Sequence, residues 1–181
     1  TNGIQIPPFF SLNILSETPS DDAPQPYFPK GSDVISALNS NYGLYCIFNH
    51  GNPNSIATAT SGINELVFPR YQITSSDNYT SANITPENGN GLDNLTNYNF
   101  PTITYSISCN SMPFDDFDPW GVNKKIPINT RNIGTSYTVA NKGGGPIFIG
   151  YTRESINYFA NELIYSFFNL QPTIPQLGVN M

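Results

Sequence analysis

The apolar residues of the chain gather in short continuous runs separated by polar stretches. Four of these runs have the length and composition of β-strands, at residues 9–15, 44–49, 102–108 and 146–151. We interpret these runs as strands covered on both faces. The pattern therefore predicts buried strands of a mostly parallel sheet.

Three other stretches have the features of helices. Residues 32–38 can be capped by Ser32, and residues 133–141 are followed by the glycines at 143–145. The third stretch, residues 153–168, places its apolar residues on one helical face: Ile156, Phe159, Ala160, Leu163, Ile164 and Phe167. Strands that alternate with helices predict an α/β fold with a parallel sheet.

The length and the loops favour a single domain. The 181 residues suffice for one domain with a substantial core, and no internal repeat divides residues 1–181. Residues 18–30 are rich in proline and form a predicted extended loop. Residues 74–99 are rich in Asn, Ser, Thr and Gly, and we expect them to form a long loop on the surface.

Composition narrows the class of protein. Only 11% of the residues are charged, Lys and Arg together number 7, and the formal net charge is −6, which argues against a nucleic-acid partner. No apolar run reaches the roughly 18 residues of a membrane span. Low charge with abundant Asn, Ser, Thr and Tyr is common in secreted and cell-surface proteins. The chain begins at Thr1 without an initiator methionine, and we expect it to be part of a longer precursor.

The residues best suited to nucleophilic catalysis follow two of the predicted strands. Ligands of parallel sheets bind outside the carboxyl ends of the strands. The only histidine, His50, follows the run 44–49, and Cys109 follows the run 102–108, 59 residues after His50. That interval is long enough for a crossover between neighbouring parallel strands, so we expect both side chains at one edge of the sheet.

This pair has the chemistry of a thiol nucleophile with a general acid. A cysteine thiol ordinarily titrates near about 8.5, so a neighbouring imidazolium is needed to favour the thiolate at neutral pH. The imidazole can then give a proton to a departing amine. Gly51 has no Cβ, so its N–H can approach an oxyanion. Without such pairing, Cys109 is a buried thiol or half of a disulfide, and His50 is a surface imidazole.

The second cysteine tests the disulfide alternative. Cys46 precedes His50 by four residues on the same predicted strand, about 13 Å below the strand end. A disulfide requires Cα atoms within about 7 Å of each other. A bridge between Cys46 and Cys109 is therefore incompatible with a His50–Cys109 pair at the strand ends, and we interpret Cys46 as an apolar core residue.

Polar residues after the second strand end are candidates for a substrate pocket. They are Asn110, Asp115 and Asp116, and the two acids could receive a basic side chain. Asp116, Asp118 and Gly121 have the spacing that starts an EF-hand loop, which makes a structural calcium ion an alternative, although a proline occupies the place of the final glutamate. The third interpretation is a solvated acidic loop.

Three sequence blocks around these residues resemble the gingipain-type cysteine peptidases. Residues 33–51 end in GLYCIFNHG and resemble the family's helix, glycine, apolar strand and His-Gly. Residues 101–111 (PTITYSISCNS) resemble its nucleophile strand followed by Cys-Asn, and residues 144–153 (GGPIFIGYTR) resemble the strand that comes next. The three blocks occur in the order in which the family has them.

This resemblance implies a caspase-like three-layer αβα sandwich with a mostly parallel sheet. It implies a cysteine endopeptidase that is secreted or held at a bacterial cell surface, cleaves proteins or peptides and requires no cofactor. His50 would match the catalytic histidine and Cys109 the nucleophile, with the backbone N–H groups of Gly51 and Cys109 as the oxyanion hole.

Departures from the family pattern leave an alternative open. Only the run 9–15 precedes the histidine block, so we expect part of the sheet to be missing, and a second chain or another segment of the precursor would complete it. Thr135 or Ser136 stands where relatives often carry an acid, and no residue matches the acidic partner of the histidine. The alternative is an inactive gingipain-like fold that acts as a surface binding or adhesion module.

Overall fold

The computed structural model describes residues 15, 29–40, 42–60, 70–79, 84–113 and 131–153. The chain divides into two compact units, and all of these residues belong to the unit that spans residues 15–154. The predicted strand 9–15, apart from Leu15, and the predicted helix 153–168, apart from Arg153, lie outside the described residues.

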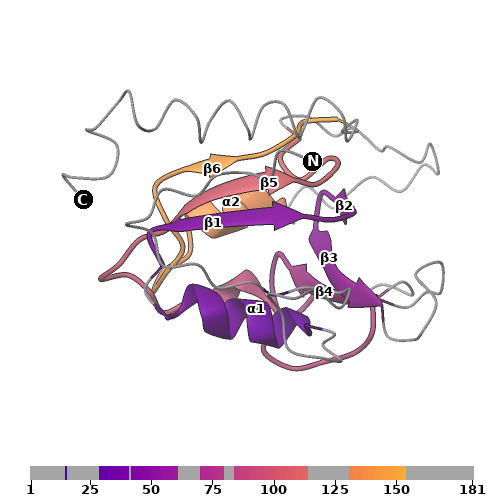
Figure 1. Ribbon diagram of the computed structural model, residues 1–181, viewed down its shortest axis with the longest axis horizontal. Coiled ribbons are helices and arrows are strands. Elements are labelled where there is room, and N and C mark those ends of the chain that lie inside the picture. The colour runs from indigo at the N-terminus through magenta and orange to yellow at the C-terminus, as the bar shows by residue number, and fades with distance from the viewer. Residues whose placement is uncertain are drawn as a thin grey trace, which may run out of the picture. The chain divides into compact units, whose positions relative to one another are not determined.

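A three-stranded parallel sheet, sheet A, carries the strands that the apolar runs predict. It contains β1 (Leu44–Phe48), β5 (Ile103–Ile107) and β6 (Phe148–Ile149), in the order β1-β5-β6 (Figure 1). All neighbouring strands are parallel. The prediction of a parallel sheet at these three places is confirmed, although β6 is shorter than the apolar run at 146–151.

A second sheet, sheet B, occupies part of the crossover from β1 to β5. It contains β2 (Gly51–Asn52), β3 (Ser55–Thr60) and β4 (Arg70–Thr74), which are antiparallel in the order β2-β3-β4. The apolar runs do not predict it, because β3 reads SIATAT and has only one large apolar residue. That residue, Ile56, is fully buried and anchors the strand in the core.

The first helix, α1 (Gly31–Leu38), begins at a cap that the sequence does not reveal. The N-cap residue is Lys30, so the prediction that Ser32 caps the helix is wrong. The carboxylate of Glu87 accepts hydrogen bonds from the N–H of Gly31 at 3.1 Å and from the N–H of Ser32 at 2.7 Å. A negative charge at a helix N-terminus also complements the helix dipole. The capping group therefore comes from a distant part of the chain.

The second helix, α2 (Ile133–Thr138), begins where the sequence predicts and ends earlier. Its N-cap is Asn132, whose Oδ1 accepts a hydrogen bond from the N–H of Thr135 at 2.8 Å. The helix stops at Thr138, short of the predicted end at residue 141. The chain then reverses with Gly144 at a φ of +81°, a conformation that glycine adopts without steric cost.

The predicted surface loop at residues 74–99 is only partly at the surface. It contains a short 3-10 helix, η1 (Leu92–Asn94), and Thr74 pairs with Gly91 in a parallel bridge. Leu92 and Leu95 are each 1% exposed. The prediction was wrong for this part of the loop, because a few well-spaced leucines among many polar residues suffice to anchor it in the core.

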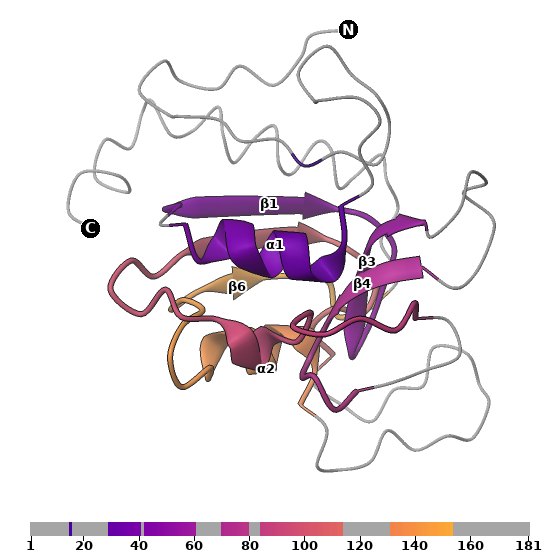
Figure 2. The same cartoon turned by 90° about the horizontal axis from the view of Figure 1, so that it is seen from below.

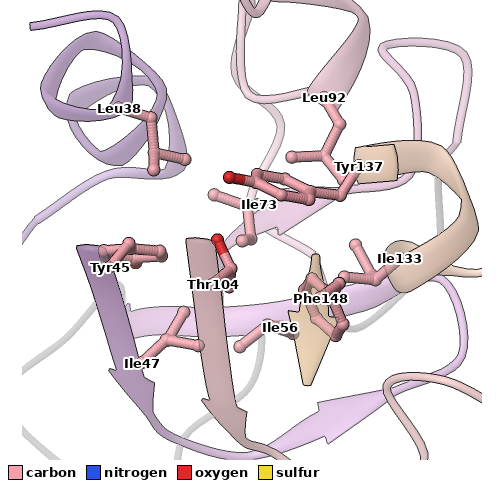
Figure 3. Close-up of a pocket in the computed structure, with 10 residues that line it drawn as sticks. All are labelled: Leu38, Tyr45, Ile47, Ile56, Ile73, Leu92, Thr104, Ile133, Tyr137 and Phe148. Atoms are coloured by element: carbon pink, nitrogen blue, oxygen red, sulfur yellow. The ribbon is translucent and has the colours of Figure 1, made fainter. Parts of the chain in front are cut away.

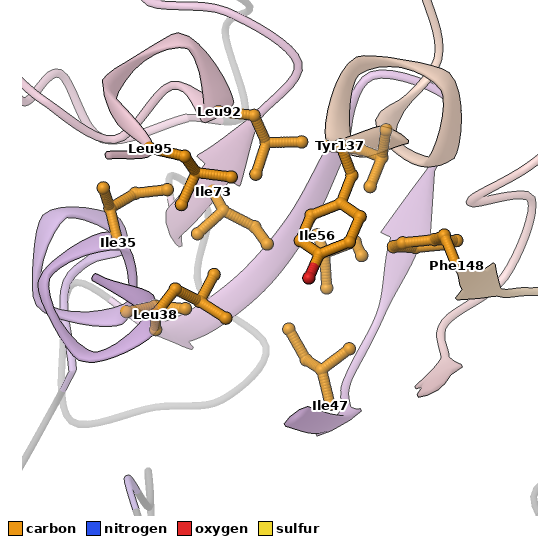
Figure 4. Close-up of a cluster of buried hydrophobic side chains, with 11 residues drawn as sticks. Ile35, Leu38, Ile47, Ile56, Ile73, Leu92, Leu95, Tyr137 and Phe148 are labelled. Carbon is orange, nitrogen blue, oxygen red and sulfur yellow. The ribbon is translucent and has the colours of Figure 1, made fainter. Parts of the chain in front are cut away.

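The described core lies between sheet A, sheet B and the helices. Figures 1 and 2 show α1 and α2 on the same side of sheet A, with sheet B beside them. Eleven buried side chains form one contiguous cluster (Figure 4): Val34, Ile35, Leu38, Ile47, Ile56, Ile73, Leu92, Leu95, Ile133, Tyr137 and Phe148. Removing this apolar surface from water stabilises the arrangement that holds the strand ends.

Tyr137 connects α2 to sheet A within this core. Its hydroxyl donates a hydrogen bond to the carbonyl oxygen of Thr102 at 2.5 Å, and its ring centroid lies 5.7 Å from that of Phe148. Figure 3 shows the small cavity around it, which is lined almost entirely by apolar side chains from both sheets and the helices. Neither His50 nor Cys109 lines this cavity, so it belongs to the packing of the core.

Candidate active site

The register of β1 and β5 aligns His50 with Cys109. Five consecutive pairs join the two strands, from Leu44 with Ile103 to Phe48 with Ile107, and each pair is separated by 59 positions in the sequence. His50 and Cys109 are also 59 positions apart, and each lies two residues beyond the last pair. Both residues therefore follow the carboxyl ends of adjacent parallel strands at the same level of the sheet.

Contacts of Gly51 show that the two strand ends touch. A Cβ atom placed on Gly51 would lie 2.7 Å from the Cβ of Ser108 and 2.9 Å from the carbonyl oxygen of Cys109. Both distances are shorter than side chains tolerate, and neither neighbouring atom belongs to a flexible side-chain end. The chain after His50 therefore packs directly against the chain at Cys109, and glycine is the residue that permits this approach.

The N–H of Gly51 points away from sheet B. The N–H of Ala57 donates to the carbonyl oxygen of His50 at 2.9 Å, and Gly51 pairs with Ile56 in the next position of the same antiparallel ladder. Hydrogen-bonded and non-hydrogen-bonded pairs alternate in such a ladder. The Gly51–Ile56 pair is thus a non-hydrogen-bonded one, and β3 does not use the N–H of Gly51.

An Asx turn holds the chain just after this glycine. The Oδ1 of Asn52 accepts hydrogen bonds from the N–H of Asn54 at 2.9 Å and from the N–H of Ser55 at 3.0 Å. The Nδ2 of Asn52 also donates to the hydroxyl of Ser55 at 2.8 Å. No pattern singles out these residues in advance, although the string NPNS has the composition of a turn.

The turn that begins at Cys109 is fixed by the chain after β6. Asn110 has a φ of +52° and is the sole non-glycine residue with positive φ among those described. Its N–H donates to the carbonyl oxygen of Arg153 at 2.9 Å, and the N–H of Met112 donates to that of Tyr151 at 3.0 Å. A left-handed residue of this kind costs backbone energy and is retained where the surroundings hold it.

The exposures of the site residues differ. His50 is exposed and Cys109 is partly exposed, so solvent reaches both. Asn110 is 2% exposed, so its side chain offers no open surface to a substrate in this structure. The other two pocket candidates, Asp115 and Asp116, lie outside the described residues.

Several buried polar atoms around Cys109 have no hydrogen-bond partner in the described part of the chain. They are Ser108 Oγ, Asn110 Oδ1, Ser111 Oγ and Tyr151 OH. Most buried polar groups in proteins are satisfied, and exceptions are concentrated at functional sites or at ordered water. Unpaired buried polar atoms are therefore concentrated in the turn after β5 and its neighbour Tyr151.

The two cysteines are not joined by a disulfide. Cys46 lies within β1, opposite Tyr105 of β5, four residues before the aligned strand ends. Burial raises the pKa of the Cys46 thiol to about 12, so it stays protonated at neutral pH. The geometric argument against a disulfide is confirmed. The raised pKa disfavours the thiolate form of Cys46.

Metal ligands are not gathered in the residues that the structure describes. No group of three or more His, Cys, Asp and Glu side chains there could hold a metal ion. The candidate calcium loop, with Asp116, Asp118 and Gly121, lies outside those residues.

Comparison with known proteins identifies the family. The chain matches the model of Peptidase family C25 over residues 13–180, which include all three blocks described above. Comparisons with curated proteins and with solved structures give no significant match. The mixed α/β architecture with its parallel sheet agrees with a caspase-like fold in an incomplete domain.

Membership of the family establishes the class of activity. Its members are cysteine peptidases, which act on proteins or peptides, and gingipain-family members are extracellular. Within the described ranges, no helix has both the length and the apolar character needed to cross a bilayer. The chain therefore belongs to Peptidase family C25, the gingipain family of cysteine peptidases.

Proposed function

We propose that the chain is a secreted cysteine endopeptidase that uses His50 and Cys109 as its catalytic dyad. The observation that carries the proposal is the shared offset of 59 positions, which aligns the two residues at the ends of adjacent parallel strands. The close approach of Gly51 to Ser108 and Cys109 supports it, because it holds the two strand ends together.

In this mechanism, the sulfur of Cys109 attacks the carbonyl carbon of the scissile peptide bond. The carbonyl oxygen becomes an oxyanion, and His50 in its protonated form gives a proton to the departing amine. The resulting thioester is the acyl-enzyme intermediate. A water molecule then attacks it, with His50 accepting the proton, and releases the carboxylic acid and the Cys109 thiolate, which restores the thiolate and the protonated His50.

The backbone N–H groups of Gly51 and Cys109 form the oxyanion hole in this proposal. The Gly51 N–H is suited to the role because β3 does not use it. Two fixed N–H donors that face the developing charge stabilise it without any reorganisation at the moment of reaction. The chemistry needs no metal, and a calcium ion at residues 116–121 would have a structural role only.

The remaining proposals concern the surroundings of the site. Asp115 and Asp116 would line the pocket for a substrate side chain. Asn110, whose side chain is buried, would stabilise the turn that begins at Cys109. A further segment of the precursor, or a second chain, would complete the sheet. The site would work outside the cell, as it does in the family.

A covalent probe tests the assignment. A peptide with a thiol-reactive ketone should label the wild-type chain at Cys109, and Cys109→Ala should abolish the labelling. His50→Ala should slow labelling by at least about 100-fold, because the variant loses both the general acid–base group and the imidazolium that favours the Cys109 thiolate. Cys46→Ala is the matched control and should label at the wild-type rate, since the Cys46 thiol is held protonated in the strand.

Two outcomes would contradict the proposal. Labelling that persists in Cys109→Ala would place the nucleophile elsewhere. A wild-type chain that neither labels nor cleaves peptides, although folded and supplied with the rest of its precursor, would favour the inactive binding or adhesion module.

A further inference from the structure

The first turn of α2 contacts both chain segments of the proposed dyad. The N–H of Ile133 donates to the carbonyl oxygen of Pro53 at 2.7 Å, three residues after His50. The N–H of Gly134 donates to the carbonyl oxygen of Ser111 at 3.1 Å, two residues after Cys109. The first N–H groups of a helix have no partner within the helix, so here the two loops supply their acceptors.

Two asparagine side chains reinforce this junction. The Nδ2 of Asn132 donates to the carbonyl oxygen of Pro113 at 2.8 Å. The Nδ2 of Asn54 donates to the carbonyl oxygen of Arg131 at 3.2 Å, across 77 positions of sequence. One bond thus holds the segment after Cys109 and the other holds the turn after His50, and both end on the residues that start α2.

Tight packing fixes the helix start against the cysteine turn. A Cβ atom on Gly134 would lie 2.8 Å from Met112 Cγ and 3.0 Å from Phe148 Cδ1. The first turn of α2 therefore has van der Waals contact with Met112 as well as a hydrogen bond to the carbonyl of Ser111. We name residues 131–134 the α2 bracket.

We propose that Asn132 is a positioning residue for the peptidase reaction, because it ties the Cys109 turn to the α2 bracket, which also holds the turn after His50. This inference rests on the proposed His50–Cys109 dyad. Asn132 does not touch the reacting atoms. It acts through the carbonyl of Pro113, and it limits the movement of Cys109 relative to His50.

The two ends of the Asn132 side chain have separable tasks. Its Oδ1 caps α2 through the N–H of Thr135, whereas its Nδ2 holds the carbonyl of Pro113. Serine is as good an N-cap as asparagine but has no group that reaches Pro113. Asn132→Ser therefore keeps the helix cap and removes the tether to the cysteine turn.

A matched control exists at the other end of the core. Asn39 has the same bonding pattern at the C-terminal end of α1: its Oδ1 accepts from the N–H of Thr96 at 2.7 Å, and its Nδ2 donates to the carbonyl of Asn94 at 3.2 Å. It ties the end of α1 to residues 94–96, and neither has a part in the dyad. Asn39→Ser therefore reports the general cost of losing such a tether.

The experiment compares kcat and KM of both variants on a fluorogenic peptide that the wild-type protein cleaves, with urea unfolding measured in parallel. Asn132→Ser should lower kcat by at least about 10-fold with KM changed less than about 2-fold, because small misplacements of reacting groups cost rate more than binding. Its urea midpoint should fall no more than that of Asn39→Ser, which should keep wild-type kcat. Asn54→Ala cuts the other half of the junction and should also lower kcat.

The outcomes separate this inference from the proposed function. Wild-type protein whose Cys109 shows no His50-dependent labelling would refute the dyad itself. An active wild type with Asn132→Ser and Asn39→Ser equal in kcat would overturn the positioning role alone. The positioning role would also be overturned if two results occurred together. Asn132→Ser would lose kcat and unfold at a lower urea concentration than Asn39→Ser, and Asn54→Ala would keep the wild-type kcat.

Discussion

The two cysteines of the chain, both partly exposed, differ in where each lies relative to its strand. Cys46 is inside β1, and burial raises the pKa of its thiol to about 12. Cys109 is beyond the end of β5 and partly exposed. The position of each residue relative to its strand end, which can be read from the sequence, suffices to tell a core thiol from a candidate nucleophile.

The buried thiol should make stability sensitive to alkaline pH. In the unfolded chain the Cys46 thiol titrates near its ordinary value of 9.0, whereas in the folded chain it stays protonated to about 12. The unfolded state therefore binds fewer protons in this window, and the free energy of unfolding decreases as pH rises above about 9, by at most about 1.4 kcal/mol per pH unit for one such group.

Urea unfolding of wild type and Cys46→Val between about pH 8 and about pH 10.5 measures this term. The wild-type curve should decline more steeply than that of Cys46→Val. The pKa of Tyr45 is also raised, chiefly by burial and to a lesser extent by Cys46, so Cys46→Val removes the titration of the thiol together with this smaller effect on Tyr45. Parallel curves would mean that the folded chain does not hold the Cys46 proton.

At the scale of elements, the strands that carry the site were the predictable ones. The strand-like runs at 44–49 and 102–108 become β1 and β5 of sheet A, where β5 is buried throughout and β1 is mostly half-buried. The strands of sheet B are not found in this way, because they have little apolar signal of their own: β3 reads SIATAT, and Ile56 is its one large apolar residue. The sequence alone therefore reveals strands that carry several apolar residues of their own and misses strands, such as β3, that form mainly by hydrogen bonding to neighbouring strands.

The same division applies to the candidate site. His50, Gly51 and Cys109 follow from the rule that chemistry gathers at the carboxyl ends of parallel strands. Asn54 and Asn132 could not be found, because each bonds to a backbone carbonyl, which leaves no trace in residue identity. In a chain rich in asparagine, no composition signal separates these two from the others.

Gly51 offers a test of how closely the strand ends must fit. In Gly51→Ala the new Cβ meets the Cβ of Ser108 and the carbonyl oxygen of Cys109, so backbone must move. We expect at least about 10-fold lower kcat/KM, since a misplaced reacting group costs rate, and about 1–3 kcal/mol lower unfolding free energy from overpacking.

Gly43→Ala is the control for the alanine substitution itself. Gly43 precedes the other end of β1, and an added Cβ there meets nothing within 4 Å. This variant should retain wild-type kcat/KM and unfolding free energy. If Gly51→Ala also retained the wild-type kcat/KM and unfolding free energy, the close packing of the two strand ends would not be required for activity or stability.

At the scale of the whole described unit, one core supports the site from one side of sheet A. Tyr137 of α2 reaches across it and donates a hydrogen bond to the carbonyl of Thr102, immediately before β5. Burial raises the pKa of this tyrosine, so its hydroxyl stays protonated and can donate. The start of the nucleophile strand is thus tied to the helix whose other end forms the α2 bracket.

Tyr137→Phe should test this tie. The change removes the donor and leaves the Thr102 carbonyl without it, which should lower the unfolding free energy by about 1–3 kcal/mol. Urea unfolding measures the loss, and Tyr98→Phe, at a side chain that is 69% exposed, should change it by less than about 0.5 kcal/mol. Equal stability of the two variants would show that this bond does not support the core.

The constant separation of 59 positions along β1 and β5 has a consequence for how such chains can diverge. Insertions and deletions in the middle of the crossover leave the two strand ends opposite each other, since hydrogen bonding resets the alignment. One residue gained or lost between Leu44 and His50, or between Ile103 and Cys109, would move one partner by about 3.3 Å and turn its side chain to the other face. Related chains that keep the chemistry should therefore vary in the length of the crossover but keep the same number of residues between Leu44 and His50 and between Ile103 and Cys109.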